Sequence, residues 1–185
     1  KKNKFGLCFT HHHDIEYYKK KTNIEFIFWP FAFNPENFNY HNEEKNIDLA
    51  FTGILQNKNK FAQQSNLRCK IMDKLFFCFL DNILKKKNKY KELNIYWNSI
   101  PRTIFGRFLK KTIFYKKRLN YKVYVTLLKK TKIFINTLSP IGLVSPRYFE
   151  NMGSKCLVFC EESENYKNIF KDNTYVTFKN DLSDF

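Results

Sequence analysis

Short hydrophobic runs alternate with amphipathic segments along nearly the whole chain. A short apolar run bounded by turn residues is typical of a buried strand, and apolar positions at helical spacing follow several of these runs. Strands that alternate with helices indicate βα units around a parallel sheet. The pattern therefore predicts the α/β class, with a Rossmann-like, mostly parallel sheet and helices on both faces.

The predicted elements follow one another closely. Strands are expected at residues 5–10, 24–29, 48–53, 93–97, 133–136, 156–160 and 175–178. Helices are expected at residues 14–21, 66–86, 120–130, 146–153 and 163–171, and residues 180–185 read as a cap and first helical turn. Because residues 30–46 are irregular and marked by proline, we place a domain boundary there. Residues 1–46 then end a first domain and its linker, and residues 47–185 form a second domain, truncated at its C-terminus. Since both ends appear cut, we expect a fragment.

Composition limits the classes of protein that fit. The chain is 43% hydrophobic and 18% aromatic, which supplies a packed core and argues against disorder. No apolar run approaches the roughly 20 residues that span a bilayer, and no signal peptide is recognisable, so we expect a cytoplasmic location. The five cysteines are odd in number and form no CxxC pair, so they read as buried thiols rather than disulfides or zinc ligands.

The positive charge is local. The formal net charge is +16, and residues 85–132 hold 16 Lys and Arg against one acidic residue, Glu92. Interleaved aromatic residues make this segment the basis of an alternative function, non-catalytic nucleic-acid binding, although no RNP, KH, zinc-finger or helix-turn-helix signature supports it. Peripheral contact with anionic lipid at the inner membrane face is a second interpretation. A solvated basic face is the third.

Residues 136–155 are the most informative about chemistry, because they read as a strand end, a loop of small residues and a helix. Parallel sheets bind ligands at the carboxyl ends of their strands, and helix N-termini present unpaired N–H groups to phosphate. Arg147 and Glu150 lie one helical turn apart near the start of that helix. The guanidinium suits phosphate and the carboxylate suits sugar hydroxyls. The alternative is an i,i+3 pair on the surface.

The order of these segments resembles the nucleotide-sugar domain of GT-B glycosyltransferases, specifically the group 1-like enzymes related to spore-maturation glycosyltransferases. The matching runs are residues 132–136, 145–153, 156–160, 161–164 and 166–170. Residues 46–53 look like the first strand and glycine turn of that domain, and Arg68 looks like the basic residue of its first helix. Residues 28–38 resemble the crossover between the two domains. The resemblance covers nearly the whole chain.

The resemblance implies a metal-independent, hexosyltransferase-like enzyme that uses a nucleotide-diphosphate sugar as donor substrate and needs no cofactor. Arg147 and Arg68 would hold the pyrophosphate, Glu150 would take ribose hydroxyls, and Gly53 would let the backbone approach the donor. The implied loop residues are Asn136, Ser139 and Gly142. The catalytic residue is unknown, and the acceptor is an unidentified glycan, lipid-linked or protein group. Because most of a first domain would be missing, we expect the chain alone to be inactive.

One departure concerns the donor loop. Many retaining enzymes of this fold carry two glutamates eight positions apart, and the position eight residues before Glu150 is Gly142. The second glutamate, which the resemblance assigns to the ribose, is therefore matched, while the first is absent. The stereochemical outcome of the reaction stays open.

Three histidines and an aspartate, residues 11–14, follow the first predicted strand. Imidazole and carboxylate are suitable metal ligands, but alternate strand residues face opposite sides, so at most His11 and His13 converge. No further cluster completes a metal shell, and we expect no metal site. If the resemblance holds, this strand end faces the cleft between two domains, where His11 or His13 would contact donor or acceptor. Simple solvation of the strand end is the alternative.

Overall fold

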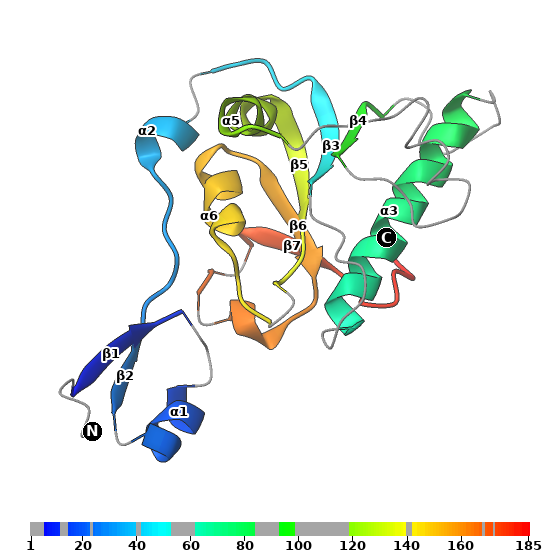
Figure 1. Cartoon of the computed structure of the whole chain (residues 1–185). Coiled ribbons are helices and arrows are strands. Elements are labelled where there is room, and N and C mark those ends of the chain that lie inside the picture. The colour runs from blue at the N-terminus through cyan, green and yellow to red at the C-terminus, as the bar shows by residue number, and fades with distance from the viewer. Residues whose placement is uncertain are drawn as a thin grey trace.

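The computed structural model describes residues 6–11, 15–22, 24–39, 42–52, 62–83, 93–98, 119–139, 142–167, 169–171 and 173–185. Within these residues the main feature is a parallel sheet of five strands in the order β4-β3-β5-β6-β7. The strands are β3 (Ile47–Thr52), β4 (Ile95–Asn98), β5 (Thr131–Asn136), β6 (Leu157–Glu161) and β7 (Tyr175–Phe178). The predicted α/β class is confirmed (Figure 1).

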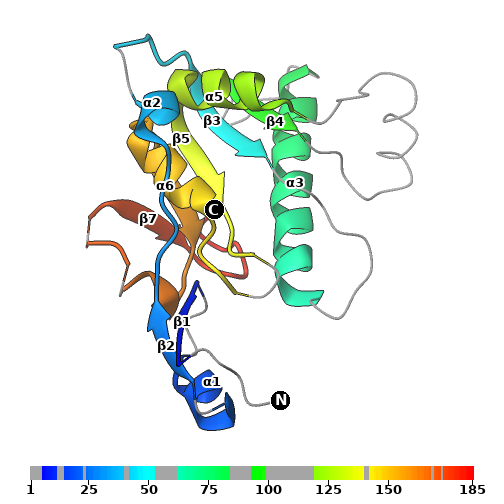
Figure 2. The same ribbon diagram turned by 60° about the vertical axis from the view of Figure 1, so that its left-hand side comes forward.

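Helices cover both faces of this sheet, as predicted. They are α3 (Ala62–Ile83) on one face, and α5 (Tyr121–Lys130) and α6 (Pro146–Gly153) on the other (Figure 2). Successive strand residues point to opposite faces, so neighbouring positions join different cores. Phe51 and Ile135 pack against α3, whereas Ala50 and Phe134 pack with residues of α5.

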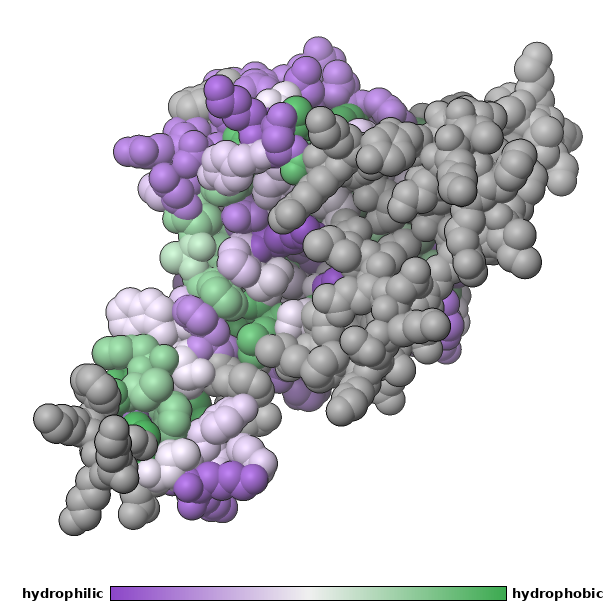
Figure 3. All heavy atoms as spheres, viewed as in Figure 1, coloured by the Kyte–Doolittle hydropathy of each residue, from purple (hydrophilic) through white to green (hydrophobic). Residues whose placement is uncertain are grey.

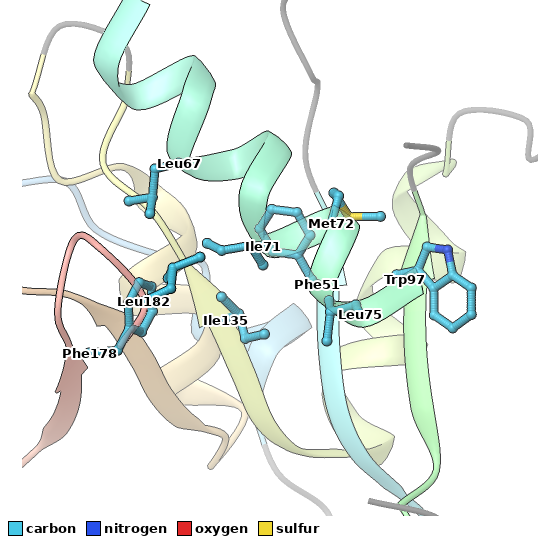
Figure 4. Packing of buried hydrophobic residues seen from close by; sticks show 9 residues of the cluster. All are labelled: Phe51, Leu67, Ile71, Met72, Leu75, Trp97, Ile135, Phe178 and Leu182. Carbon is cyan, nitrogen blue, oxygen red and sulfur yellow. The ribbon is translucent and has the colours of Figure 1, made fainter. Parts of the chain in front are cut away.

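A cluster of nine buried residues forms the core beneath α3. Figure 4 shows that side chains from one face of α3 meet the strands and the C-terminal segment; its members are Phe51, Leu67, Ile71, Met72, Leu75, Trp97, Ile135, Phe178 and Leu182. Burying a large apolar side chain contributes about 1.5–3 kcal/mol. This packing fixes α3, and therefore Arg68 on its first turns, relative to the strand ends.

Local signals account for the helices on the opposite face. The side chain of Asn120 accepts a hydrogen bond from the Val123 N–H at 2.9 Å and so caps the start of α5. Pro146 occupies the first turn of α6, where its missing N–H is not needed. The helix at residues 146–153 is confirmed with the predicted bounds.

A small N-terminal unit precedes the sheet. It consists of β1 (Leu7–Thr10), α1 (Ile15–Thr22) and β2 (Glu25–Phe28), in which β1 and β2 pair in parallel. A linker leads from it to the sheet and contains one helical turn, α2 (Pro35–Phe38). Phe38 is buried against α5 and α6, which anchors the linker. The domain division at residue 46 stays a prediction.

Three expectations need correction. The helix predicted at residues 163–171 is wrong: the described part is a short 3₁₀ helix, η1 (Glu164–Tyr166), followed by hydrogen-bonded turns and a bend. Tyr166 and Phe170 have helical spacing, but both are buried in the cluster around Tyr148, and this tertiary packing determines the backbone there. Residues 180–185 form turns rather than the start of a helix. Part of the stretch expected to be irregular is the helical turn α2. Among the described helices, none is both long and apolar enough to cross a bilayer.

Candidate functional site

The candidate site lies where β3 and β5 end. β4 lies on one side of β3 and β5 on the other, so the strand order reverses between β3 and β5. Ligands of open α/β sheets bind at such a reversal, beyond the carboxyl ends of the strands. Thr52 ends β3 and Asn136 ends β5, and both are buried. Within the described residues, Thr52 Oγ1 and Asn136 Nδ2 have no hydrogen-bond partner. A buried polar atom without a partner is rare and calls for a ligand or a water molecule.

Two arginines converge on this edge from opposite faces of the sheet. Arg147 of α6 donates from Nη1 to the carbonyl oxygen of Thr52 at 2.6 Å. Arg68 of α3 donates from Nε to Thr137 Oγ1 at 2.6 Å and from Nη2 to the carbonyl oxygen of Leu138 at 2.8 Å. Burial, and then the charge of Arg147, lower the pKa of Arg68. Among the described residues neither guanidinium forms an ion pair with a carboxylate, so two like charges lie close together without direct neutralisation.

Glu150 is held by a residue of the neighbouring helix. Tyr124 of α5 donates its hydroxyl hydrogen to Glu150 Oε2 at 2.8 Å. The guanidinium carbon of Arg147 lies 6.0 Å from the centre of the same tyrosine ring, at the limit of a cation–π contact. Burial raises the pKa of Glu150. Arg147 and Glu150 form no ion pair with each other, so the surface-pair interpretation does not describe this geometry.

The loop between β5 and α6 is a tight turn. Ser139 and Leu143 exchange two hydrogen bonds: the Ser139 N–H donates to the Leu143 carbonyl at 2.9 Å, and Ser139 Oγ accepts from the Leu143 N–H at 3.0 Å. Gly142 has φ +76°, and its carbonyl accepts from Asn165 Nδ2 at 3.0 Å. A side chain with a Cβ is strained in this left-handed conformation. The turn therefore accounts for glycine at the position where many retaining enzymes of the fold carry the first of two glutamates.

Glu161, on the neighbouring strand β6, holds this loop by a hydrogen bond. It ends β6, is only 1% exposed, and accepts a hydrogen bond from the Leu138 N–H to Oε1 at 2.6 Å. Its Oε2 accepts from the Tyr166 hydroxyl at 3.3 Å, and that hydroxyl lies 2.8 Å from the hydroxyl of Tyr148. Burial raises the pKa of Glu161. The carbonyl oxygen of Leu138 accepts from Arg68, so both main-chain polar groups of Leu138 are hydrogen-bonded to side chains.

Most of the predicted donor residues come together. Arg68, Asn136, Arg147 and Glu150 lie on the segments that meet at the strand ends, and the adjoining loop contains Ser139 and Gly142. Gly53 and His13 lie outside the described residues, as do most of residues 85–118. His11 lies in the N-terminal unit beside Trp29. In the part of the chain that is described, no three His, Cys, Asp or Glu side chains are placed to hold a metal ion.

Sequence reasoning missed three residues of this edge. In the sequence Thr52 is one residue of a predicted strand, Tyr124 is one of several aromatic residues in the basic segment 85–132, and Glu161 belongs to a run that matches the family, so none of them stands out as a site residue. The signal for Glu161 was a carboxylate directly after a fully apolar strand, since a charge in such a position needs partners. No comparable signal marks Tyr124.

The fold and this edge define a Rossmann-like α/β domain with a polar, basic site at the reversal of its strand order. A family profile described as glycosyl transferase-like matches residues 79–185, which is more than half of the chain. The chain therefore belongs to this glycosyl transferase-like family, within the group 1 glycosyltransferases, and the resemblance stated above is confirmed at that level. No curated protein and no solved structure gave a significant match.

Proposed function

We propose that the edge formed by β3 and β5 binds the diphosphate of a nucleotide sugar, the donor substrate of a glycosyl transfer. The observation that carries this proposal is the convergence of Arg68 and Arg147 at the strand ends without a carboxylate partner among the described residues. A guanidinium has five N–H donors in a planar fork, and the contacts within the described residues use two on Arg68 and one on Arg147. The remaining donors suit phosphate oxygens.

Glu150 would bind the ribose of the donor. Tyr124 occupies Oε2 and orients the carboxylate, and Oε1 has no hydrogen-bond partner in the described part of the chain. If a ribose hydroxyl donated to Oε1, both oxygens of the carboxylate would accept a hydrogen bond. Asn136 Nδ2 and Thr52 Oγ1 are further unpartnered groups for the donor, and Ser139, Gly142 and Gly53 complete the set that we assign to it.

The positive charge at this edge would stabilise the diphosphate as it leaves during the reaction. When the bond between the anomeric carbon and the diphosphate oxygen breaks, the electron pair leaves with the diphosphate. A hydroxyl oxygen of the acceptor forms the new bond to carbon and loses its proton to a base that we do not assign. Arg68, Arg147 and the N-terminal end of α6 would stabilise the negative charge on the leaving group. We propose that these groups suffice without a metal ion.

The proposal is tested by titrating the chain with UDP and GDP, followed by amide NMR and calorimetry. Arg147→Ala should weaken binding roughly 10- to 100-fold, since a hydrogen bond to a charged group contributes about 1.5–3 kcal/mol. Arg147→Lys should recover part of the loss, because it keeps the charge without the fork. Lys132→Ala is the matched control: it removes one positive charge from an exposed ion pair with Asp48 at the start of β5. Equal affinity in wild type and Arg147→Ala would remove Arg147 from the site.

A polyanion titration tests the alternative function. A short oligonucleotide added at low and at moderate salt should leave the amides of residues 136–150 unperturbed. Nucleic-acid binding through residues 85–132 predicts the reverse pattern: salt-dependent binding of the oligonucleotide and no response to either diphosphate. That outcome would replace the donor-site proposal.

A further inference from the structure

Tyr124 lies against both charged residues of α6 that we assign to the donor. Its hydroxyl donates to Glu150 Oε2 at 2.8 Å, and the guanidinium carbon of Arg147 lies 6.0 Å from the centre of its ring. Tyr124 belongs to α5, which covers the same face of the sheet as α6 (Figure 2). One side chain of a neighbouring helix therefore meets the group that would bind the ribose and the group that would bind the diphosphate.

The ring of Tyr124 is held by two buried aromatic residues. It meets Phe38 of the linker with centroids 6.3 Å apart and 69° between the planes. It meets Phe134 of β5 with centroids 6.5 Å apart and 89° between the planes. Aromatic pairs favour such edge-to-face arrangements. Because both neighbours are buried, the ring has little freedom to turn, and its hydroxyl is placed toward Glu150 before any ligand binds.

The hydroxyl of Tyr124 also affects the charge of Glu150. Burial raises the pKa of Glu150, whereas the hydrogen bond from Tyr124 and the positive charge of Arg147 lower it. These two side chains are the titratable and charged groups that act on this carboxyl in the described part of the chain. Burial and the charge of Glu150 raise the pKa of Tyr124, so its hydroxyl keeps its hydrogen at neutral pH. A hydroxyl that donates to a carboxylate favours the ionised form.

We propose that Tyr124 is a positioning residue of the donor site, which keeps Glu150 ionised with Oε1 open to the ribose and limits where Arg147 can lie. A hydrogen bond to an ionised acceptor is roughly twice as strong as one to a neutral acceptor. The ionised form of Glu150 therefore binds a ribose hydroxyl more tightly than the protonated form. The inference rests on the proposed function and deepens it, because it assigns a role to a residue that acts through Glu150 and Arg147.

The experiment compares nucleotides that have and lack a ribose hydroxyl. The chain is titrated by calorimetry with UDP, GDP and their 2′-deoxy and 3′-deoxy counterparts, between about pH 5 and pH 8. The ratio of the affinities for a nucleotide and its deoxy counterpart isolates the missing hydroxyl, because the titration of the phosphates is common to both and cancels. In the wild type this ratio should rise as pH rises through the pKa of Glu150, since the carboxyl becomes ionised.

Tyr124→Phe keeps the ring and removes the hydroxyl. At about pH 7 it should lower the affinity ratio about 3- to 10-fold, and it should move the rise of the ratio to higher pH. Tyr121→Phe is the matched control, since it makes the same change on the same helix at a residue that is 53% exposed. The surface over α5 is largely hydrophilic in Figure 3. The control should keep the ratio of the wild type, and amide NMR reports whether each variant is folded.

A double variant separates positioning from support of the fold. In Glu150→Gln the amide cannot ionise, so the affinity ratio should not vary with pH. Adding Tyr124→Phe to Glu150→Gln should then change the ratio less than about 2-fold, because the carboxylate on which Tyr124 acts is gone. If Tyr124 only supported the fold, Tyr124→Phe would lower the ratio by the same factor with and without the carboxylate.

A lower ratio and a shifted pH profile in Tyr124→Phe, both absent in Tyr121→Phe and in the Glu150→Gln background, support the proposal. It is overturned if Tyr124→Phe behaves as the wild type does, if it loses the same factor in both backgrounds, or if the wild type binds nucleotide and deoxynucleotide equally. Arg147→Ala separates these outcomes from the proposed function. If it weakens UDP or GDP binding while Tyr124→Phe leaves the ratio unchanged, the diphosphate site stands and the role of Tyr124 fails. If the wild type binds neither nucleotide, both fail.

Discussion

Replacing Glu161 should test how the donor loop is supported. Glu161→Ala removes the acceptor of the Leu138 N–H and of the Tyr166 hydroxyl, whereas Glu161→Gln keeps an acceptor for Leu138. A buried donor left without a partner costs about 1–3 kcal/mol. The bond to Leu138 is short, and Tyr166 retains Tyr148 as a partner, so the main loss is at Leu138. With the apolar contacts of the lost methylene, at about 0.8 kcal/mol, Glu161→Ala should lose about 2–4 kcal/mol.

The amide variant should behave differently. Its oxygen can accept from Leu138, and its NH₂ group can donate to the hydroxyl of Tyr166, which is free to turn its hydrogen toward Tyr148. We expect Glu161→Gln to lose less than about 1 kcal/mol. Glu162→Ala is the matched control, because the neighbouring Glu162 is exposed and its backbone N–H, not its side chain, bonds to Phe178. Surface substitutions of this kind stay within about 0.5 kcal/mol.

Urea unfolding followed by tryptophan fluorescence measures these differences. With a slope of about 1–3 kcal/mol per molar urea, the midpoint of Glu161→Ala should fall by about 1–2 M, and diphosphate affinity should fall with it. A midpoint for Glu161→Ala equal to those of Glu161→Gln and Glu162→Ala would refute the reasoning. It would show that the Leu138 N–H finds another partner.

The same carboxyl should make stability depend on pH. Burial raises the pKa of Glu161 above its usual 4.5, so the folded state binds this proton more tightly than the unfolded state. Its contribution to stability is therefore fully present below pH 4.5 and is lost as pH rises through the raised pKa. The difference in unfolding free energy between wild type and Glu161→Gln should shift in favour of the variant over that interval. A difference that is constant with pH would contradict the burial argument.

Three further predictions concern the linker and the loop, each measured by urea unfolding. Nζ of Lys45 lies within 3.5 Å of four main-chain carbonyl oxygens at the C-terminal ends of α5 and α6, and its three hydrogens are shared among them, so Lys45→Met should lose about 1.5–3 kcal/mol, against little for the exposed Lys130→Met. A Cβ at Gly153 would lie 2.5 Å from the ring of Phe33, so Gly153→Ala should lose about 1–3 kcal/mol, and much less when combined with Phe33→Ala. Gly142→Ala should lose about 1 kcal/mol or more through its positive φ.

The fold could be predicted from the sequence because its determining signals are local. Strands such as 157–161 lie inside the sheet and carry apolar residues on both faces, so a nearly unbroken apolar run marks them, and the structure moves the predicted strand bounds by at most two residues. The prediction of a helix at residues 163–171 was wrong for the opposite reason, because the backbone there is determined by tertiary packing. Tyr166 and Phe170 have the spacing of a helix face, yet they pack around Tyr148 from a 3₁₀ turn, which only the tertiary structure determines.

The site could be predicted only in part. Arg147 and Glu150 were found because they belong to one short segment with a recognisable order. Their partners could not be found, since Thr52 is 95 positions from Arg147 and Tyr124 is 26 positions from Glu150. The packing of α5 and α6 on the sheet brings these groups together, and residue order alone does not specify which side chains meet. Glu161, 23 positions from Leu138, is a further case.

The structure separates residues that would contact the donor from residues that position its loop. Arg147→Ala loses one hydrogen bond to Thr52 but also removes a charge that disfavours the ionised form of Arg68. The two effects oppose each other, so the unfolding free energy should change by less than about 1 kcal/mol while diphosphate affinity falls. Glu161→Ala should lose stability and affinity together, because the loop it holds carries Leu138, to which Arg68 is bonded. If Arg147→Ala also lost both, Arg147 would be a support of the fold, and the case for a preformed diphosphate site would fail.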